Sequence, residues 1–474
     1  MSSVARQYSV PLSVGAGRSI QLNGTDYLGL FMAAVGVATW GVGYFVGIEH
    51  AIAGLAFVGF AAAILGLGYP ALGLFGIGIL CLMDTPMRYA LLNKGGLLRW
   101  NTYNYWLVIV LVLYSPFLLR VRSIQWVIWQ ALILLMIIQL SYSPEAWSGA
   151  QQIMNLLALF SLSVFFARAI DDHRAWFWLG MILGLVGTAG GLVFVIKGAQ
   201  YVGISINQWV RFPLTAVFAI CLAMQFGVTR GRERGQALLF LLATINVGWV
   251  FLAGSRGAII MGLMCLVFLM TRIRGRGAWL KIAGGLAAMV VCACLLFPER
   301  VEATLGRFEL LFNSQESTTD RTSGRSDLFV GGWYMFLDNP LGSGTGGFET
   351  GWSHLAIQGQ MSGYRAGEEF PAHSGWIKTL VENGVLGVVL FTAFVASFLV
   401  TGIRQRYRGV LGFTILISAM LAFSAITTEF QGKGLMMLTA GAIVMLHSGD
   451  FLTAWQKSIK TRFRPMIRRR EGSR

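Results

Sequence analysis

Residues 176–197 read WFWLGMILGLVGTAGGLVFVIK, and no charged side chain occurs in this stretch before Lys197. A helix needs about 20 mostly apolar residues to cross the hydrocarbon core of a bilayer, so the stretch predicts a transmembrane helix. The pattern recurs along the chain of 474 residues, of which 55% are hydrophobic and 12% are charged. Because soluble domains have about 25% charged residues, we expect an all-α, polytopic membrane protein with about 12–14 transmembrane helices.

Fourteen apolar stretches are candidate spans, and their order along the chain is 27–46, 51–67, 70–85, 104–119, 124–142, 151–167, 176–197, 213–229, 236–253, 257–272, 279–297, 376–400, 409–427 and 433–448. The second and third are short, and Tyr69-Pro70 divides them. Every second connection is rich in arginine, for example Arg120 with Arg122 and Arg230 with Arg234. Basic loops stay on the cytoplasmic side of a membrane, so we expect both termini to be cytoplasmic and the first span to act as the targeting signal.

This topology divides the chain into five parts: a cytoplasmic N-terminal segment (1–26), a transmembrane bundle (27–297), a periplasmic loop with short helices (298–375), C-terminal transmembrane helices (376–448) and a basic cytoplasmic tail (449–474). The net charge of +16 is placed mainly on cytoplasmic loops and the tail. It favours contact with anionic membrane lipids and not with nucleic acid.

The predicted periplasmic loop has the opposite charge, because ten acidic and five basic side chains give it a net charge of −5. A loop of this length is usually functional or disordered. Its aromatic residues favour a folded structure, with an amphipathic helix at 325–338 and turns at Asn339-Pro340 and 342–347. The glycine-rich run 342–347 resembles a phosphate-binding loop only loosely, since no Lys-Ser/Thr pair follows it; backbone turns are the better interpretation.

The five cysteines all lie in apolar stretches, where buried thiols are expected: Cys81, Cys221, Cys265, Cys292 and Cys294. Their spacing gives no disulfide framework. No cluster of His, Cys and Asp suggests a metal site, and the residues indicate no cofactor.

Two arginines occupy unusual positions on the predicted periplasmic side. Arg256 lies in Gly254-Ser-Arg-Gly-Ala258, a connection of a few residues between two spans, and Arg211 precedes Phe212-Pro213 at the start of another. A guanidinium group is always charged and binds phosphate through a planar fork, and a helix N-terminus favours anions. The structural alternatives are snorkelling to headgroups for Arg256 and an interfacial anchor beside Trp209 for Arg211.

His373 lies in Pro371-Ala-His-Ser-Gly-Trp376, where the long loop re-enters the membrane. Histidine is the side chain best suited to act as a base near neutral pH, although a lone interfacial histidine is more often structural. His354 in the same loop is a weaker candidate. Two arginines, a histidine and an aromatic loop on one membrane face together suggest a site for a lipid-linked sugar diphosphate.

The same residues resemble a known family. His373-Ser374, nine residues, Gly384, two residues and Gly387 are similar to the H-[NSQ]-x9-G-x-x-G pattern of the O-antigen ligase and Wzy-type polymerase superfamily. Gly254-Ser-Arg-Gly-Ala258 resembles its Ser-Arg element, and the stretch 339–348 resembles its Pro-x-x-G-x-G stretch. The order of motifs agrees over about residues 205–400. Leu390 departs from the Gly, Thr or Tyr that many ligases have in an extension of the motif.

The resemblance implies a metal-independent glycosyltransferase of the GT-C type in a bacterial inner membrane, with its active site on the periplasmic face. The donor would be a glycan on undecaprenyl diphosphate. Arg211 and Arg256 would hold the diphosphate, and His373 would orient or deprotonate the acceptor hydroxyl. Arg325 would be a further diphosphate ligand, or else a cap of the loop helix.

The acceptor separates two activities of the family. A polymerase transfers the glycan to another lipid-linked repeat unit of O-antigen, capsule or exopolysaccharide, whereas a ligase transfers it to the lipid A-core of lipopolysaccharide. The number of spans, Leu390 and the N-terminal segment favour the polymerase, for which a chain-length regulator is a candidate partner. A flippase or other transporter is the alternative from another class, but a transporter should place charged residues along several spans, and here the spans have almost none.

Overall fold

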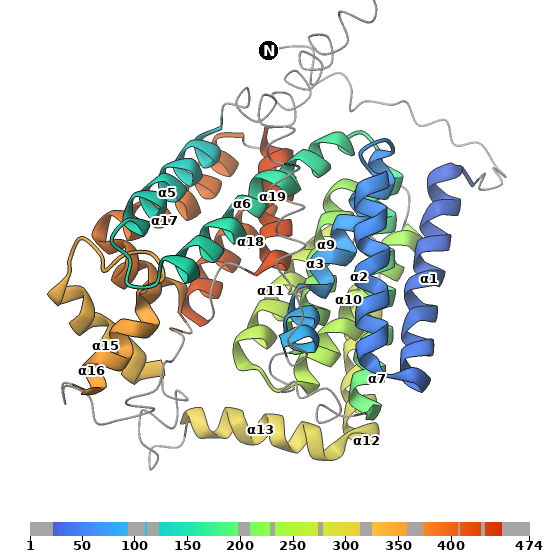
Figure 1. Cartoon of the computed structure of the whole chain (residues 1–474). Coiled ribbons are helices and arrows are strands. Elements are labelled where there is room, and N and C mark those ends of the chain that lie inside the picture. Colours follow the sequence, from blue (N-terminus) through green and yellow to red (C-terminus); the bar gives the residue numbers. More distant parts are fainter. Residues whose placement is uncertain are drawn as a thin grey trace, which may run out of the picture.

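A computed structural model describes residues 22–92, 110, 123–197, 209–227, 233–273, 278–312, 325–357, 372, 374–405, 408–427 and 432–447. The described residues form helices joined by turns (Figure 1). In chain order they are α1 (Gly24–Val46), α2 (Ile48–Leu65), α3 (Pro70–Leu92), α5 (Ile124–Leu140), α6 (Ala146–Arg168), α7 (His173–Lys197), α9 (Arg211–Leu222), α10 (Glu233–Leu252), α11 (Arg256–Arg272), α12 (Ala278–Leu296), α13 (Pro298–Phe312), α15 (Arg325–Asp338), α16 (Phe348–Ile357), α17 (Gly375–Gln405), α18 (Arg408–Thr427) and α19 (Lys433–Leu446).

The helices outside the segment 298–357 coincide with predicted spans. Each of the fourteen stretches overlaps a helix except 104–119, which lies outside the described residues apart from the buried Val110. In the described part of the chain, six helices are long and apolar enough to cross a membrane, or seven if the bent pair α12 and α13 forms one span. Shorter apolar helices complete the bundle. The chain is thus an all-helical, polytopic membrane protein, as its composition predicts.

The segment after α12 covers one end of the bundle, which we call the loop end (Figure 1). The helix axis bends by 109° between α12 and α13, so that α13 lies across the ends of the spans. Helices α15 and α16 pack on the first half of α17 around a small separate core. Its buried side chains include Leu328, Phe348, Trp352 and Ile377. The helix predicted at 325–338 is confirmed as α15, whereas the sequence did not predict α13.

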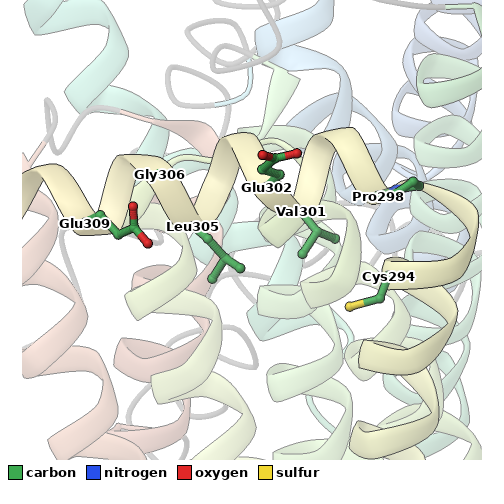
Figure 2. A pocket seen from close by; sticks show the side chains of 7 residues that line it. All are labelled: Cys294, Pro298, Val301, Glu302, Leu305, Gly306 and Glu309. Carbon is green, nitrogen blue, oxygen red and sulfur yellow. The ribbon is translucent and has the colours of Figure 1, made fainter.

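A cavity of about 440 Å³ lies in the angle between α12 and α13 (Figure 2). Cys294 of α12 and Val301, Glu302, Leu305 and Glu309 of α13 are among its lining residues. The prediction of buried thiols is therefore wrong for Cys292 and Cys294, which are exposed, and right for Cys81, Cys221 and Cys265. The reason is that α12 is a peripheral helix: Val290, Val291, Leu295 and Leu296 are between 54% and 75% exposed, as expected of side chains that face lipid.

The end of α6 and the starts of α1, α5 and α7 lie at the opposite end of the bundle, which we call the basic end. The Arg168 guanidinium at the end of α6 donates to the carbonyls of Gly66 and Leu67, at 3.1 and 2.6 Å, after α2. The Gln125 amide at the start of α5 donates to the Thr401 hydroxyl, 2.9 Å away, near the end of α17. Helices far apart in sequence thus end on the same side, as alternating spans require.

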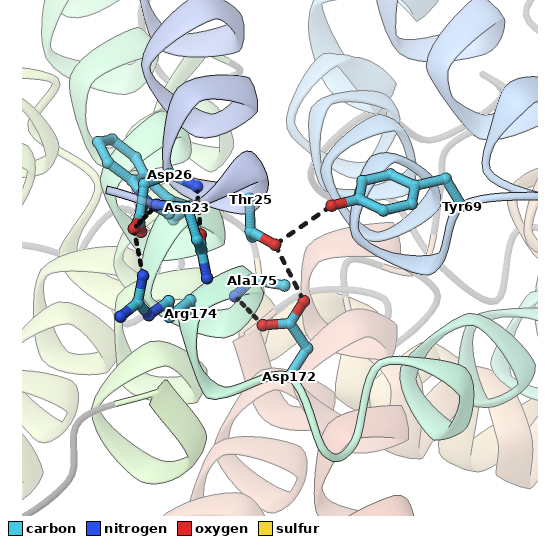
Figure 3. A network of polar contacts seen from close by, with 8 residues as sticks. Asn23, Thr25, Asp26, Tyr69, Asp172, Arg174 and Ala175 are labelled. Atoms are coloured by element: carbon cyan, nitrogen blue, oxygen red, sulfur yellow. Dashed lines mark hydrogen bonds and ion pairs between the residues drawn. The ribbon is translucent and has the colours of Figure 1, made fainter. Parts of the chain in front are cut away.

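A polar network holds the start of α1 at the basic end (Figure 3). The Asp26 carboxylate accepts from the Trp178 indole at 3.0 Å and pairs with the Arg174 guanidinium at 2.5 Å. The Thr25 hydroxyl contacts the Tyr69 hydroxyl at 3.2 Å and donates to Asp172 at 3.4 Å. Because paired charges tolerate partial burial, the network fastens α1 to α7 and to the connection between α2 and α3.

Candidate functional site

Arg211 begins α9, as its position before Phe212-Pro213 predicts. Its neighbour Trp209 is buried and stacks on Phe194 of α7, with ring centroids 4.5 Å apart. The aromatic packing fixes the start of α9, while the Arg211 side chain stays half-buried. Within the described residues, no hydrogen bond or ion pair of its guanidinium is seen.

Arg256 begins α11, directly after the short turn that joins it to α10. Gly254 in this turn has φ of +69°, which glycine adopts without steric cost. The half-buried Arg256 guanidinium donates to the carbonyl of Arg307 on α13, 3.3 Å away. The structure therefore brings Arg256 next to Arg307, a residue that the sequence reasoning counted only as a loop charge. Helices α9 and α11 pack together, but the described interactions include no contact between Arg211 and Arg256.

The other predicted site residues lie at the edges of the described regions. Arg325 is the first residue of α15, but its side chain is outside the described part of the structure. His373 itself lies outside the described residues, although its neighbours Ala372 and Ser374 are buried. The Ser374 hydroxyl accepts from the amide of Ile377 at 3.4 Å, at the start of α17. His354 is an exposed residue of α16.

Helix α17 is broken at Gly384, where φ is 64° and ψ is −165°. The loop 339–348 supplies the hydrogen bonds that the break removes. The amides of Ser343 and Gly344 donate to the carbonyls of Val381 and Glu382, at 2.8 and 3.1 Å, and the Val385 amide donates to the Pro340 carbonyl at 3.2 Å. Irregular backbone at membrane depth is tolerated only where protein covers it. The glycine part of the histidine motif and the Pro-x-x-G-x-G stretch are therefore joined by backbone hydrogen bonds into one structural unit.

Replacing Gly384 by alanine should destabilise this junction. An added Cβ would lie 2.5 Å from the Leu341 carbonyl carbon and 2.5 Å from the Pro340 oxygen, at a φ that L-residues rarely adopt. Backbone strain and overpacking together predict a loss of about 2–6 kcal/mol. Thermal unfolding of the purified protein, followed by tryptophan fluorescence, measures the change. Gly412→Ala in α18 is the matched control, since its Cβ would meet nothing within 4 Å. Equal melting of the two variants would contradict the role of the break.

The loop 342–348 binds a carboxyl group of its own chain. The amide of Phe348 donates to the Glu382 carboxylate at 3.3 Å, and the amide of Gly346 also donates to it. Glycines 342, 344 and 346 all have positive φ, between 94° and 100°, which confirms the prediction of backbone turns. Because Glu382 occupies these amides, we do not assign them to a substrate phosphate.

Glu382 belongs to a buried polar cluster that the sequence reasoning missed. Its carboxylate lies 4.0 Å from the Lys378 ammonium one turn earlier on α17. The Gln152 amide of α6 bridges them, with its nitrogen 3.0 Å from Glu382 and its oxygen 3.2 Å from Lys378 in the orientation that satisfies both. On α19, the buried Lys433 ammonium donates to Asn155 at 2.7 Å. The i,i+4 pair of opposite charges in an apolar span was the available signal.

Asn383 completes the attachment of the loop to the bundle. Its amide donates to the Gln139 side chain of α5 at 2.6 Å and to the Thr345 hydroxyl at 3.1 Å. The Ser143 hydroxyl donates to the Thr345 carbonyl at 2.7 Å. Thus α5, the loop and α17 form a rigid frame next to the His373 segment. Among the described residues, no group of three or more His, Cys, Asp and Glu side chains could hold a metal ion.

Comparison with known proteins identifies the region that holds these motifs. Residues 237–392 match the family model described as O-antigen ligase. The match includes Arg256, Arg325, the broken helix and the position of His373, whereas Arg211 lies before it. No curated protein sequence matches the chain. The family indicates an activity of the O-antigen ligase or polymerase type, which is that of a membrane glycosyltransferase-like enzyme. Over residues 237–392, the chain is therefore similar to the O-antigen ligase and Wzy-type polymerase superfamily.

Proposed function

We propose that the protein transfers a glycan from undecaprenyl diphosphate to a sugar hydroxyl at the periplasmic face of the inner membrane, and that it polymerises repeat units of O-antigen, capsule or exopolysaccharide. The observation that supports the proposal is the guanidinium of Arg256 at the start of α11, beside Arg307 at the loop end. A fixed cation at this depth suits the diphosphate of a lipid whose tail lies in the bilayer.

The chemistry follows from the charge of the leaving group. The acceptor oxygen forms a bond to the anomeric carbon while the bond from that carbon to the phosphate oxygen breaks, and undecaprenyl diphosphate leaves with the electron pair. Cations placed in advance stabilise the growing negative charge, so guanidinium groups take the part that a metal ion has in other transferases. His373 orients the acceptor hydroxyl and accepts its proton. Arg211 and Arg325 are further diphosphate ligands in this proposal.

The separation of charge between the two ends of the bundle supports the orientation. Arg168 and Arg174, which the positive-inside rule places in the cytoplasm, lie at the basic end, whereas α13, α15 and α16 of the acidic segment lie at the loop end. Both termini are then cytoplasmic, and the site faces the periplasm.

An O-antigen ligase that uses lipid A-core as acceptor is the second candidate, and the description of the matching family favours it. The two functions share a donor and differ only in the acceptor hydroxyl. The span count and Leu390 are the features that favour the polymerase.

The deciding experiment uses the purified full chain in nanodiscs with an undecaprenyl-diphosphate repeat unit, in the presence of EDTA. Longer lipid-linked glycans formed without lipid A-core are the result expected of a polymerase. Glycan transfer only after lipid A-core is added would identify a ligase. If no glycosidic bond forms in either mixture when several different repeat units are tried as donors, the proposal of glycosyl transfer is wrong. Transport of the intact lipid-linked donor across the membrane would then favour a flippase.

A further inference from the structure

Arg307 lies on the side of α13 that touches the turn between α10 and α11. Its guanidinium donates to the Gly254 carbonyl at 3.1 Å, and its own carbonyl accepts from the Arg256 guanidinium at 3.3 Å. One turn earlier on α13, the Thr304 hydroxyl donates to the Phe251 carbonyl at 3.2 Å. Two guanidinium groups from segments about 50 residues apart in sequence therefore meet at one turn.

The sequence allows this close approach at two positions. A Cβ on residue 254 would lie 3.3 Å from the Thr304 hydroxyl and 3.4 Å from the Arg307 guanidinium, so glycine leaves the room that α13 needs. Pro298 begins α13 directly after the bend from α12, in a position that suits proline. The bend turns α13 back over the end of α10.

Two of the three acidic side chains of α13 are directed away from Arg307. Glu302 and Glu309 line the cavity between α12 and α13 (Figure 2). With 3.6 residues per turn, they project about 140–160° around the helix from Arg307. The carboxylates of Glu302 and Glu309 thus face the cavity, whereas Arg307 lies beside Arg256.

We propose that Arg256 and Arg307 together form the binding site for the diphosphate group of the lipid-linked donor, with Arg307 as a ligand in its own right. The inference rests on the proposed function, which it extends by naming this second cation. Two guanidinium groups held at one turn both attract an anion placed between them. Each guanidinium is a planar fork that matches one phosphate group, and a diphosphate has two.

Arg307 also has a structural contact, because it donates to Gly254, and this role must be separated from anion binding. Thr304→Val removes the neighbouring contact of α13 with the α10–α11 turn and leaves the charge unchanged. Arg307→Gln removes the charge and keeps a donor for the Gly254 carbonyl. Arg300→Gln removes an exposed arginine two turns earlier on the same helix.

The test measures the Kd of inorganic pyrophosphate, inorganic phosphate and undecaprenyl diphosphate for the purified full chain in nanodiscs. We expect Arg307→Gln to weaken binding of both diphosphates about 10- to 100-fold, and Arg307→Lys to fall between it and wild type. Thr304→Val and Arg300→Gln should stay within about twofold of wild type. Binding of undecaprenyl diphosphate but not of pyrophosphate would assign recognition to the lipid tail and overturn the proposal.

Two other outcomes would also overturn it. Wild-type affinity of Arg307→Gln would exclude Arg307 as a ligand, and equal weakening by Thr304→Val would reduce Arg307 to a structural contact. The proposed function fails separately: if the wild-type chain binds pyrophosphate through Arg307 but forms no glycosidic bond, the anion site stands and glycosyl transfer does not.

Discussion

Replacing His373 by alanine is expected to lower the turnover of glycan transfer by about 10²- to 10⁴-fold, the range for loss of a general acid or base. Donor binding should remain close to that of wild type, because in the proposed mechanism the histidine contacts the acceptor hydroxyl and not the diphosphate. The measurement is the rate of product formation at saturating donor, combined with the Kd of undecaprenyl diphosphate for the same preparation.

His354→Ala is the matched control for this variant. His354 is exposed on α16 in the same external segment, so its loss should leave turnover unchanged. If His373→Ala turns over at the wild-type rate, or if both histidine variants lose activity equally, His373 has no direct role in the transfer.

Replacing Arg256 by alanine is expected to reduce both donor affinity and turnover. In the proposed mechanism, the guanidinium binds the diphosphate before the reaction, and the charge that it stabilises increases as the bond to the anomeric carbon breaks. Loss of a single group that stabilises a transition-state charge costs about 10²- to 10³-fold in turnover. Initial rates over a range of donor concentrations separate the effect on KM from the effect on kcat.

The variant Arg256→Lys separates the effect of the positive charge from the effect of the planar guanidinium geometry. An ammonium retains the charge but offers a single point of attachment, so this variant should recover part of the lost affinity. Normal product formation by purified Arg256→Ala protein would remove the residue from the mechanism. A thermal midpoint equal to that of wild type is needed as well, because Arg256 also donates to the carbonyl of Arg307.

The spans could be predicted because a membrane imposes one rule on every segment that crosses it. Even the short stretches 51–67 and 70–85 correspond to α2 and α3, since about 20 apolar residues in succession have few other uses. Helix α13 could not be found in this way. Its sequence, PERVEATLGRFELLF, contains five charged residues, so it fails a test for apolar length, although its apolar side chains recur with helical period.

The partners within the site were harder to predict than its elements. The position of Arg211 at a helix start followed from a local pattern, and the structure confirms it. Arg256, which was predicted in the short connection before a span, is the first residue of α11. The contact of Arg256 with Arg307 depends on the 109° bend between α12 and α13, and no local pattern gives its direction. Likewise, Glu382 and Phe348 are 34 residues apart in the chain, so the role of the carboxylate in the loop was visible only in three dimensions.

The glycine-rich run illustrates how a correct local prediction leaves the function open. Its residues favoured turns, and the positive φ values of Gly342, Gly344 and Gly346 agree. The role of these turns depends on Gly384, which has a positive φ and breaks α17. The turns donate hydrogen bonds to the residues just before this break. The glycines of 342–347 and Gly384 can therefore be explained only when both stretches are considered together.

The hydrogen bonds between the stretch 339–348 and both halves of α17 have a consequence for evolution within the superfamily. Backbone hydrogen bonds link residues 340–344 to residues 381–385. Recombination with a breakpoint between the two stretches would therefore combine a loop and a helix break from different proteins, whose hydrogen-bonding groups need not fit each other. A breakpoint beyond α17 would keep the pair intact. Exchange of segments between relatives should therefore preserve the fold best when the stretch 339–348 and the start of α17 are exchanged as one block.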